Sequence, residues 1–236
     1  MIGGFGDAEV FSFHATKFLN CLEGGAVVTN DGALAQKIRL MRNFGFAAHN
    51  RVDSIGLNGK LNEISAAMGL TNLESIADFI SINLRNYKQY ESELADLEGV
   101  KLLAYSDNER SNYQYIVLEI DEGETGVNRD QLIEMLRMEN VLARHHFYPA
   151  CHQAEPYRSL YPHAHLFLPR TERVAARVMV LPTGQAITQK DVCVICDILR
   201  TALRNADIIR KRLGKMPEAR CQDRLAETFR SRRKLG

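Results

Sequence analysis

The chain has 236 residues, of which 45% are hydrophobic and 25% charged, an ordinary globular composition with material for one large domain or two smaller ones. It has no run of about 18 apolar residues, so no membrane-spanning helix is expected. The start lacks the basic and apolar regions of a signal peptide, and the five scattered cysteines favour free thiols, so we expect a cytoplasmic protein.

The net charge of +1 conceals an asymmetry along the chain. From Arg200 onward there are twelve Lys/Arg and four Asp/Glu, a balance of +8, which leaves −7 for residues 1–199. A basic tail can bind nucleic acid, but this one contains a single aromatic residue, Phe229, and no nucleic-acid motif. We therefore expect residues 206–236 to be a flexible, solvated tail, and nucleic acid is not an expected partner.

The N-terminal part reads as two strands with an irregular loop between them. Residues 9–13 and 25–29 have strand character, and the loop that they flank contains Lys17. A helix is predicted from the cap candidates Asn30-Asp31 to a stop near Gly45. Residues 46–60, rich in Asn and Gly, read as a loop.

A long helical region, from Leu61 to about Leu97, is expected to join two domains. The elements predicted after it are a strand over 113–120, a helix over 129–139 capped by Asn128, a strand over 141–148, a helix over 173–179, a short strand edge over 180–182 and a last helix over 189–205. That order is typical of a small α/β domain.

Lys17 stands in an unusual local setting. Its sequence neighbours are three aromatic residues, two hydroxyl residues and an imidazole: Phe11, Phe13, Phe18, Ser12, Thr16 and His14. Desolvation lowers the pKa of a lysine amine, so this setting favours a lysine that attacks a carbonyl. The alternative from the residues alone is a lysine whose stem covers the edge of a core.

Several longer motifs extend the pattern around this lysine. They are Gly6-Asp7, Phe11-Ser-Phe-His-Ala-Thr-Lys17, Glu23-Gly-Gly-Ala-Val-Val-Thr29, Arg42-Asn-Phe-Gly45, Gly56-Leu-Asn-Gly-Lys-Leu-Asn-Glu-Ile-Ser-Ala-Ala-Met-Gly-Leu70, Tyr148-Pro-Ala-Cys-His152 and Leu181-Pro-Thr-Gly184. Together they cover residues 3 to about 203. In this order they resemble the DegT/DnrJ/EryC1/StrS family of sugar aminotransferases.

The resemblance implies an α/β protein of the aspartate-aminotransferase-like fold type I that uses pyridoxal 5'-phosphate (PLP). Such enzymes transfer an amino group from an amino acid, glutamate in most relatives, to a nucleotide-linked keto sugar, for polysaccharide or glycoconjugate biosynthesis. It implies that Lys17 forms the Schiff base and carries protons, and that Ser12 holds the cofactor phosphate. Asn58 would reach the phosphate of the neighbouring subunit's cofactor, so a homodimer is expected. Relatives with histidine at the lysine position are dehydratases, whereas lysine favours transamination.

The resemblance also indicates a missing part, because family members place this lysine near the middle of a longer chain. The groups that hold the pyridine ring would precede it, and Asp7, the only aspartate before Lys17, reads as a turn residue. We expect a truncated large domain over 1–75, a linking helix with a small C-terminal domain over 76–205, and the tail. The alternative is a non-catalytic remnant that acts as a dimerisation or regulatory module.

The remaining chemical patterns have structural explanations. Cys193 and Cys196 have CxxC spacing, but they lie in a predicted amphipathic helix without a second pair, which favours core packing. The dense histidines after residue 144 match no standard metal spacing, so no metal is expected. His14 could tune the lysine, contact substrate or make a structural hydrogen bond, and His152 could lie near the sugar nucleotide.

Overall fold

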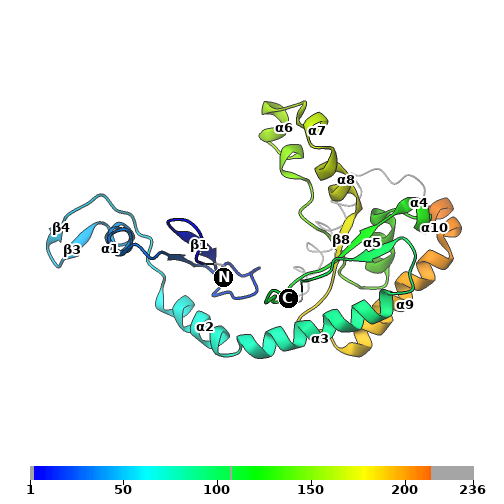
Figure 1. Ribbon diagram of the computed structural model, residues 1–236, viewed down its shortest axis with the longest axis horizontal. Helices are drawn as coiled ribbons and strands as arrows, with labels where there is room; N and C mark the ends of the chain where they lie inside the picture. Colours follow the sequence, from blue (N-terminus) through cyan, green and yellow to red (C-terminus); the bar gives the residue numbers. More distant parts are fainter. Residues whose placement is uncertain (1–2, 107, 214–236) are drawn as a thin grey trace, which may run out of the picture. The chain divides into compact units, whose positions relative to one another are not determined.

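The computed structural model describes residues 3–106 and 108–213 (Figure 1). They form two compact units, one up to Ser81 and one from Ile82, and the division falls inside helix α3 (Ile76–Leu94). The domain boundaries expected after residues 75 and 205 remain predictions. Within the described ranges, no helix is long and apolar enough to cross a membrane.

The first unit contains the predicted pair of strands around the lysine. Strands β1 (Glu9–Ser12) and β2 (Gly25–Val28) pair antiparallel, with Ser12 opposite Gly25. A side chain at Gly25 would place its Cβ 2.6 Å from the carbonyl oxygen of Phe11, so this position requires glycine. The sequence-based prediction of both strands is confirmed.

Helix α1 (Gly32–Met41) follows, and its predicted start is confirmed by its cap. The Asp31 carboxylate accepts hydrogen bonds from the backbone N–H groups of Ala33 and Leu34, at 2.7 and 3.1 Å. The helix ends at Met41, before the expected stop at Gly45. Gly45 instead occupies a turn with φ of +79°, beyond the end of the helix.

The prediction of a continuous loop over residues 46–60 is wrong in part. It contains a short hairpin of strands β3 (Phe46–Ala48) and β4 (Arg51–Val52), with an irregular register. Strands this short carry too few residues for an alternating pattern to stand out. Further along, Asn58 forms an isolated antiparallel bridge with Asn43.

The helix predicted over 61–97 is two helices, α2 (Glu63–Glu74) and α3, which are separated at Ser75. The Asn62 side chain caps α2 by accepting the Ser65 N–H at 2.8 Å. Between its terminal glutamates α2 has no charged residue, yet Ser65 is its only buried residue. Its apolar side chains are therefore largely exposed in this chain.

The second unit is built on a four-stranded sheet in the order β5-β6-β8-β7, with every neighbouring pair antiparallel. Its strands are β5 (Val100–Leu102), β6 (Ile116–Ile120), β7 (Arg144–His145) and β8 (Val178–Leu181). The strand predicted over 141–148 shrinks to two residues, the one over 113–120 begins at Ile116, and β5 was not predicted.

Helices α5 (Arg129–Met138) and α9 (Gln189–Arg204) close the core of this unit. Leu118 and Met179 from the sheet pack with Leu132, Leu136 and Leu199 from these helices, and all five are fully buried. Asn128 caps α5 in a capping box with Gln131, as the sequence predicted for this position. The CxxC pair lies on α9, where Cys196 belongs to the core as expected.

Shorter helices complete the unit: α4 (Glu122–Thr125), the 3₁₀ turn η1 (Cys151–Gln153), α6 (Tyr157–Leu160), α7 (Ala164–Phe167), α8 (Pro169–Arg177) and α10 (Ala206–Leu213). The helix predicted over 173–179 begins and ends earlier, because Val178 and Met179 belong to β8. The predicted flexible tail begins with α10, whose Ile209 is buried. The rest of that tail, 214–236, lies outside the described residues.

Candidate functional site

The segment between β1 and β2, residues 13–24, is called the lysine loop below. Its base is closed by two backbone hydrogen bonds, from the Phe13 N–H to the Gly24 carbonyl at 2.8 Å and from the Cys21 N–H to the Phe13 carbonyl at 2.9 Å. Cys21 is 1% exposed and fixes the returning arm of the loop. These contacts therefore hold the lysine loop in a defined conformation.

Lys17 is held by its backbone on both sides. Its N–H donates to the carbonyl oxygen of His14 at 2.9 Å, and its carbonyl accepts from Asn20 Nδ2 at 3.2 Å. Its side chain is exposed, whereas Phe13 and Phe18 are half-buried. The neighbouring aromatic residues therefore do not bury the Lys17 side chain within this chain.

Ser12 directly precedes the lysine loop, whereas Asn58 belongs to a different segment. Ser12 is the last residue of β1, and its exposed Oγ accepts a long hydrogen bond of 3.4 Å from the His14 N–H. The segment of Asn58 is held against Asn43, and the Asn58 side chain is also exposed. Ser12 and Lys17 thus lie beside and within the same loop, whereas Asn58 lies in a separate segment of the chain.

His152 belongs to the second unit and contacts a carboxylate there. Its Nε2 pairs with Glu172 Oε1 of α8, and Gln153 Nε2 donates to the other carboxylate oxygen at 2.9 Å. The hydrogen bond from His152 holds the pKa of Glu172 below its usual range, since it stabilises the charged carboxylate. This pair anchors η1 to α8, and the predicted contact of His152 with substrate remains a prediction.

The cysteines of the CxxC pair behave as packing residues. Burial raises the pKa of the Cys196 thiol to about 12, and it also raises the pKa of Cys193. Such thiols are poor nucleophiles and poor metal ligands at neutral pH. Among the residues with described coordinates, no three His, Cys, Asp or Glu side chains form a group that could hold a metal ion.

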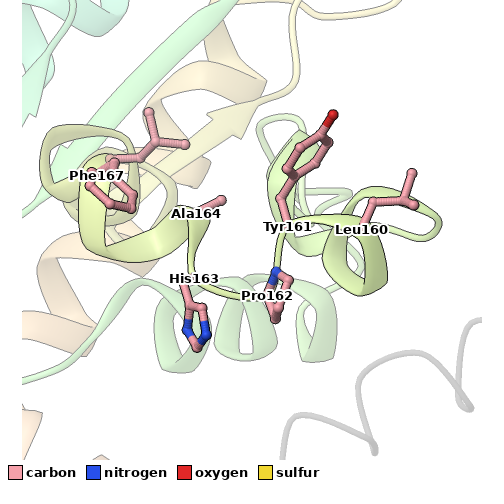
Figure 2. Close-up of a pocket in the computed structure, with 7 residues that line it drawn as sticks. Leu160, Tyr161, Pro162, His163, Ala164 and Phe167 are labelled. Carbon is pink, nitrogen blue, oxygen red and sulfur yellow. The ribbon is translucent and has the colours of Figure 1, made fainter.

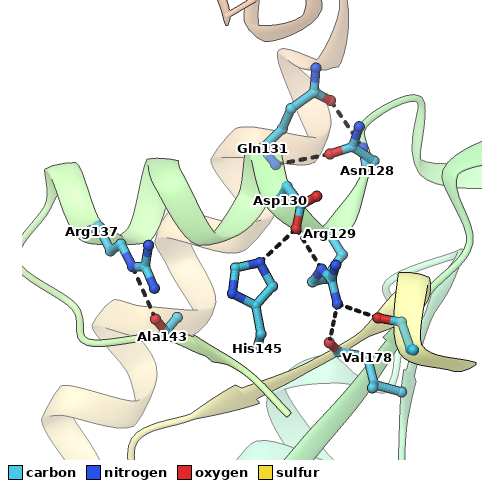
Figure 3. Close-up of polar contacts among 9 residues, drawn as sticks. Asn128, Arg129, Asp130, Gln131, Arg137, Ala143, His145 and Val178 are labelled. Carbon is cyan, nitrogen blue, oxygen red and sulfur yellow. Dashed lines mark hydrogen bonds and ion pairs between the residues drawn. The ribbon is translucent and has the colours of Figure 1, made fainter. Parts of the chain in front are cut away.

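Sequence reasoning missed a buried arginine at the start of α5 (Figure 3). Arg129 is 3% exposed, and its Nη1 donates to the carbonyl oxygens of Ala175 and Val178 at 2.7 and 3.0 Å. Its Nε donates to Asp130 Oδ1 at 2.6 Å, and that oxygen also lies 2.8 Å from His145 Nε2. The cluster joins α5 to β7, α8 and β8. An arginine after a helix cap carries no sequence signal for such burial.

A cavity of about 510 Å³ lies among the short helices of the second unit (Figure 2). Its lining is mostly apolar and consists of Leu160, Tyr161, Pro162, His163, Ala164, Phe167 and Leu168. None of the predicted site residues is among them. The lysine loop therefore remains the candidate site on chemical grounds.

Comparison with known proteins identifies the family to which these elements belong. Residues 1–200 match the model of the DegT/DnrJ/EryC1/StrS aminotransferase family. The chain belongs to this family. It is 32% identical over 177 residues to a dTDP-4-amino-4,6-dideoxy-D-glucose transaminase of Shigella dysenteriae, a match of 75% of this chain and 47% of that protein. It is 30% identical to the spore coat polysaccharide biosynthesis protein SpsC of Bacillus subtilis, over 88% of this chain and 56% of SpsC.

Solved structures give the same result. DesI, crystallised with its TDP-sugar product, is 47% identical, with a TM-score of 0.79 over 89% of this chain and 53% of DesI. Helicobacter pylori PseC, an aminotransferase of pseudoaminic acid biosynthesis, is 28% identical, with a TM-score of 0.77 over 86% of this chain and 55% of PseC. The likeness to these structures confirms the predicted fold class, the fold type I of PLP-dependent sugar aminotransferases. The chain spans about half the length of the relatives that it matches.

Proposed function

We propose that this chain is the lysine-bearing part of a cytoplasmic PLP-dependent transaminase that acts on a nucleotide-linked keto sugar, with glutamate as amino donor. The observation that supports this most is the placement of Lys17 on the loop between β1 and β2, directly after Ser12 at the end of β1, inside the family match. The names of the Shigella enzyme and of the DesI complex support a dTDP-linked sugar as the first substrate to test.

The residues of the loop fit part of the cofactor. An amine suits its carbonyl carbon and a hydroxyl suits its phosphate, and both Lys17 Nζ and Ser12 Oγ belong to exposed residues. The pyridine nitrogen needs a carboxylate, but Glu23 of the loop faces His14 at 3.7 Å. Asp7 lies before β1, at a turn where its carbonyl accepts from Thr29 Oγ1 at 2.6 Å. We infer that the residues that hold the pyridine ring come from another part of the assembly.

The role proposed for each residue follows from the part of the cofactor that it fits. When bound, PLP supplies the electron sink that stabilises negative charge at the reacting carbon. Lys17 Nζ would hold the cofactor at its carbonyl carbon, for which the amine must be neutral, and the same amine would move a proton from the donor carbon to its new position. Ser12 Oγ would donate a hydrogen bond to a phosphate oxygen, and Asn58 would donate one to the cofactor phosphate of a neighbouring subunit.

The exposed apolar surface of the first unit supports a role for a partner chain. Val10 on β1 is 78% exposed, and Ile64 and Leu70 on α2 are 79% and 63% exposed. A two-stranded sheet is marginal alone, and an apolar, uncharged helix is normally buried. We propose that another polypeptide covers these faces, with a second copy in a homodimer as the arrangement to test first.

The assignment of Lys17 is tested by trapping the cofactor. The full chain is incubated with PLP, reduced with borohydride and digested, and the modified lysine is located by mass spectrometry. We expect the adduct on Lys17, its loss in Lys17→Ala, and its retention in Lys37→Ala, which removes an exposed lysine on α1. An adduct spread evenly over surface lysines would contradict the proposed role of Lys17.

A second measurement tests the need for a complementary part. Amino transfer from glutamate to a dTDP-linked 4-keto sugar is followed with the purified chain alone. We expect turnover well below that of a full-length relative, because the ring-binding groups are not on the lysine loop. Full turnover with one cofactor per chain would overturn that inference. Partner binding without adduct formation would favour the non-catalytic module.

A further inference from the structure

Contacts from three parts of the lysine loop meet on His14. Its carbonyl oxygen accepts the Lys17 N–H at 2.9 Å, and its Nδ1 accepts the Thr16 N–H at 3.2 Å. Nδ1 is also 3.0 Å from Thr16 Oγ1, while Nε2 lies 3.7 Å from Glu23 Oε1 on the opposite arm. The imidazole therefore lies between the turn that contains Lys17 and the returning arm of the loop.

These contacts define which ring nitrogen carries the proton. A backbone N–H can only donate, so Nδ1 must accept with its lone pair, and the Thr16 hydroxyl can donate to the same atom. In a neutral imidazole that makes this contact the proton lies on Nε2, which is 3.7 Å from Glu23 Oε1. The side chain thus accepts from the backbone two residues ahead, in the manner of an Asx turn.

We propose that His14 is a positioning residue whose Nδ1 closes the turn that aims Lys17 at the cofactor carbonyl. This inference rests on the proposed function of Lys17. The lysine side chain is exposed and cannot be aimed by packing within this chain, so its direction depends on its backbone. That backbone is tied on one side to His14 and on the other to Asn20.

A matched pair of substitutions isolates the atom in question. His14→Asn keeps an acceptor, Oδ1, at the same number of bonds from the backbone as Nδ1, and Asn accepts readily in such turns. His14→Gln moves the acceptor one bond further out, to the position of Nε2. We expect the rate of adduct formation on Lys17 to stay within about threefold of wild type in His14→Asn and to fall about tenfold or more in His14→Gln, since small displacements of a reacting group are costly.

Two readouts on the cofactor-free full chain separate this inference from the function of Lys17. In the ¹⁵N spectrum of the imidazoles, the neutral ring of His14 should carry its proton on Nε2 and not on Nδ1. Hydrogen exchange of the Lys17 N–H should stay slow in His14→Asn and become faster in His14→Gln.

The outcomes are distinct for the two proposals. A proton on Nδ1 of His14, or equal Lys17 exchange in the Asn and Gln variants, would overturn the role of Nδ1. If wild-type Lys17 takes up no cofactor, the proposed function fails, while the ring spectrum and the exchange rates still decide whether His14 positions the turn. If the adduct forms equally fast in both variants, the turn does not aim the lysine.

Discussion

The side-chain amide of Asn72 donates a 2.9 Å hydrogen bond to the backbone carbonyl of Asn20 and thereby ties the lysine loop to helix α2. The two residues are 52 positions apart. Asn20 in turn contacts the Lys17 carbonyl, so one chain of hydrogen bonds runs from the helix to the proposed catalytic lysine. The orientation of Lys17 therefore depends on a residue that no local motif connects to it.

Asn72→Leu should loosen the lysine loop. The substitution keeps the branching at Cγ and removes one hydrogen bond, so the local free energy of opening should fall by about 1 kcal/mol. Hydrogen exchange of the Cys21 N–H, which bonds to Phe13 across the loop, measures this opening. Thr71→Val is the control, because Thr71 Oγ1 bonds only back along α2, to Ala67. Equal exchange in both variants would contradict the proposed link.

Arg129→Met should destabilise the second unit strongly. It leaves the carbonyl oxygens of Ala175 and Val178 without the guanidinium that they contact, and the expected loss is about 3 kcal/mol of unfolding free energy. Urea unfolding followed by far-UV circular dichroism measures it. Arg173→Met, at an exposed position on α8, should change stability by about 0.5 kcal/mol or less. Similar losses of unfolding free energy in the two variants would show that the buried contacts of Arg129 add no stability.

The ionised Asp130 carboxylate should stabilise the fold, and this stabilisation should be lost at acid pH. Burial raises the pKa of this carboxyl, but hydrogen bonds from His145 and Arg129 outweigh it and hold the pKa below its usual value. A carboxyl with a lowered folded-state pKa stabilises the fold above its unfolded pKa of about 4, and this stabilisation is lost as the pH falls through the folded value.

Asp130→Asn should therefore flatten the loss of stability below about pH 4, which urea midpoints at several pH values would show. Asp96→Asn is the matched control, because that carboxylate is 70% exposed and lies 3.8 Å from Arg200. The control should keep the wild-type slope. If stability fell with pH as steeply in Asp130→Asn as in wild type, the contacts of Asp130 with His145 and Arg129 would contribute nothing to the pH dependence of stability.

The described cysteines should react in a defined order with a thiol reagent at pH 8. Cys151 is exposed and should be labelled first, whereas burial raises the pKa of Cys196 to about 12 and should protect it until the unit unfolds. Peptide mass spectrometry over time measures the order, and Cys151→Ser should remove the fast phase on this part of the chain. Fast labelling of Cys196 in native protein would contradict its place in the core.

Local signals predicted much of the fold. Asp31 and Asn128 have side chains that cap helices by themselves, so both helix starts follow from a few adjacent residues. The strands around the lysine loop, the family and the fold type also followed from contiguous motifs. The break at Ser75 did not, because apolar residues continue at helical spacing through it.

Interactions between distant residues could not be predicted. The strand predicted over 141–148 keeps only the two residues of β7 that pair with β8, and nothing in the flanking residues indicates where this pairing ends. The local sequence does not predict the burial of Arg129 either, because its partners lie 46 and 49 positions further along the chain. For Lys17 the sequence correctly indicated a loop between two strands, but the exposure of the lysine depends on what covers the loop in space.

The uncharged, exposed stretch of α2 between its terminal glutamates has a consequence in the cell. Until a partner covers it, such a surface attracts chaperones, proteases and other unfolded chains, since all of them bind uncharged apolar segments. The cellular lifetime of this polypeptide should then rise with the amount of the protein that covers α2. Abundance measured with and without co-expression of a candidate partner would thus identify that protein even before any enzyme assay is available.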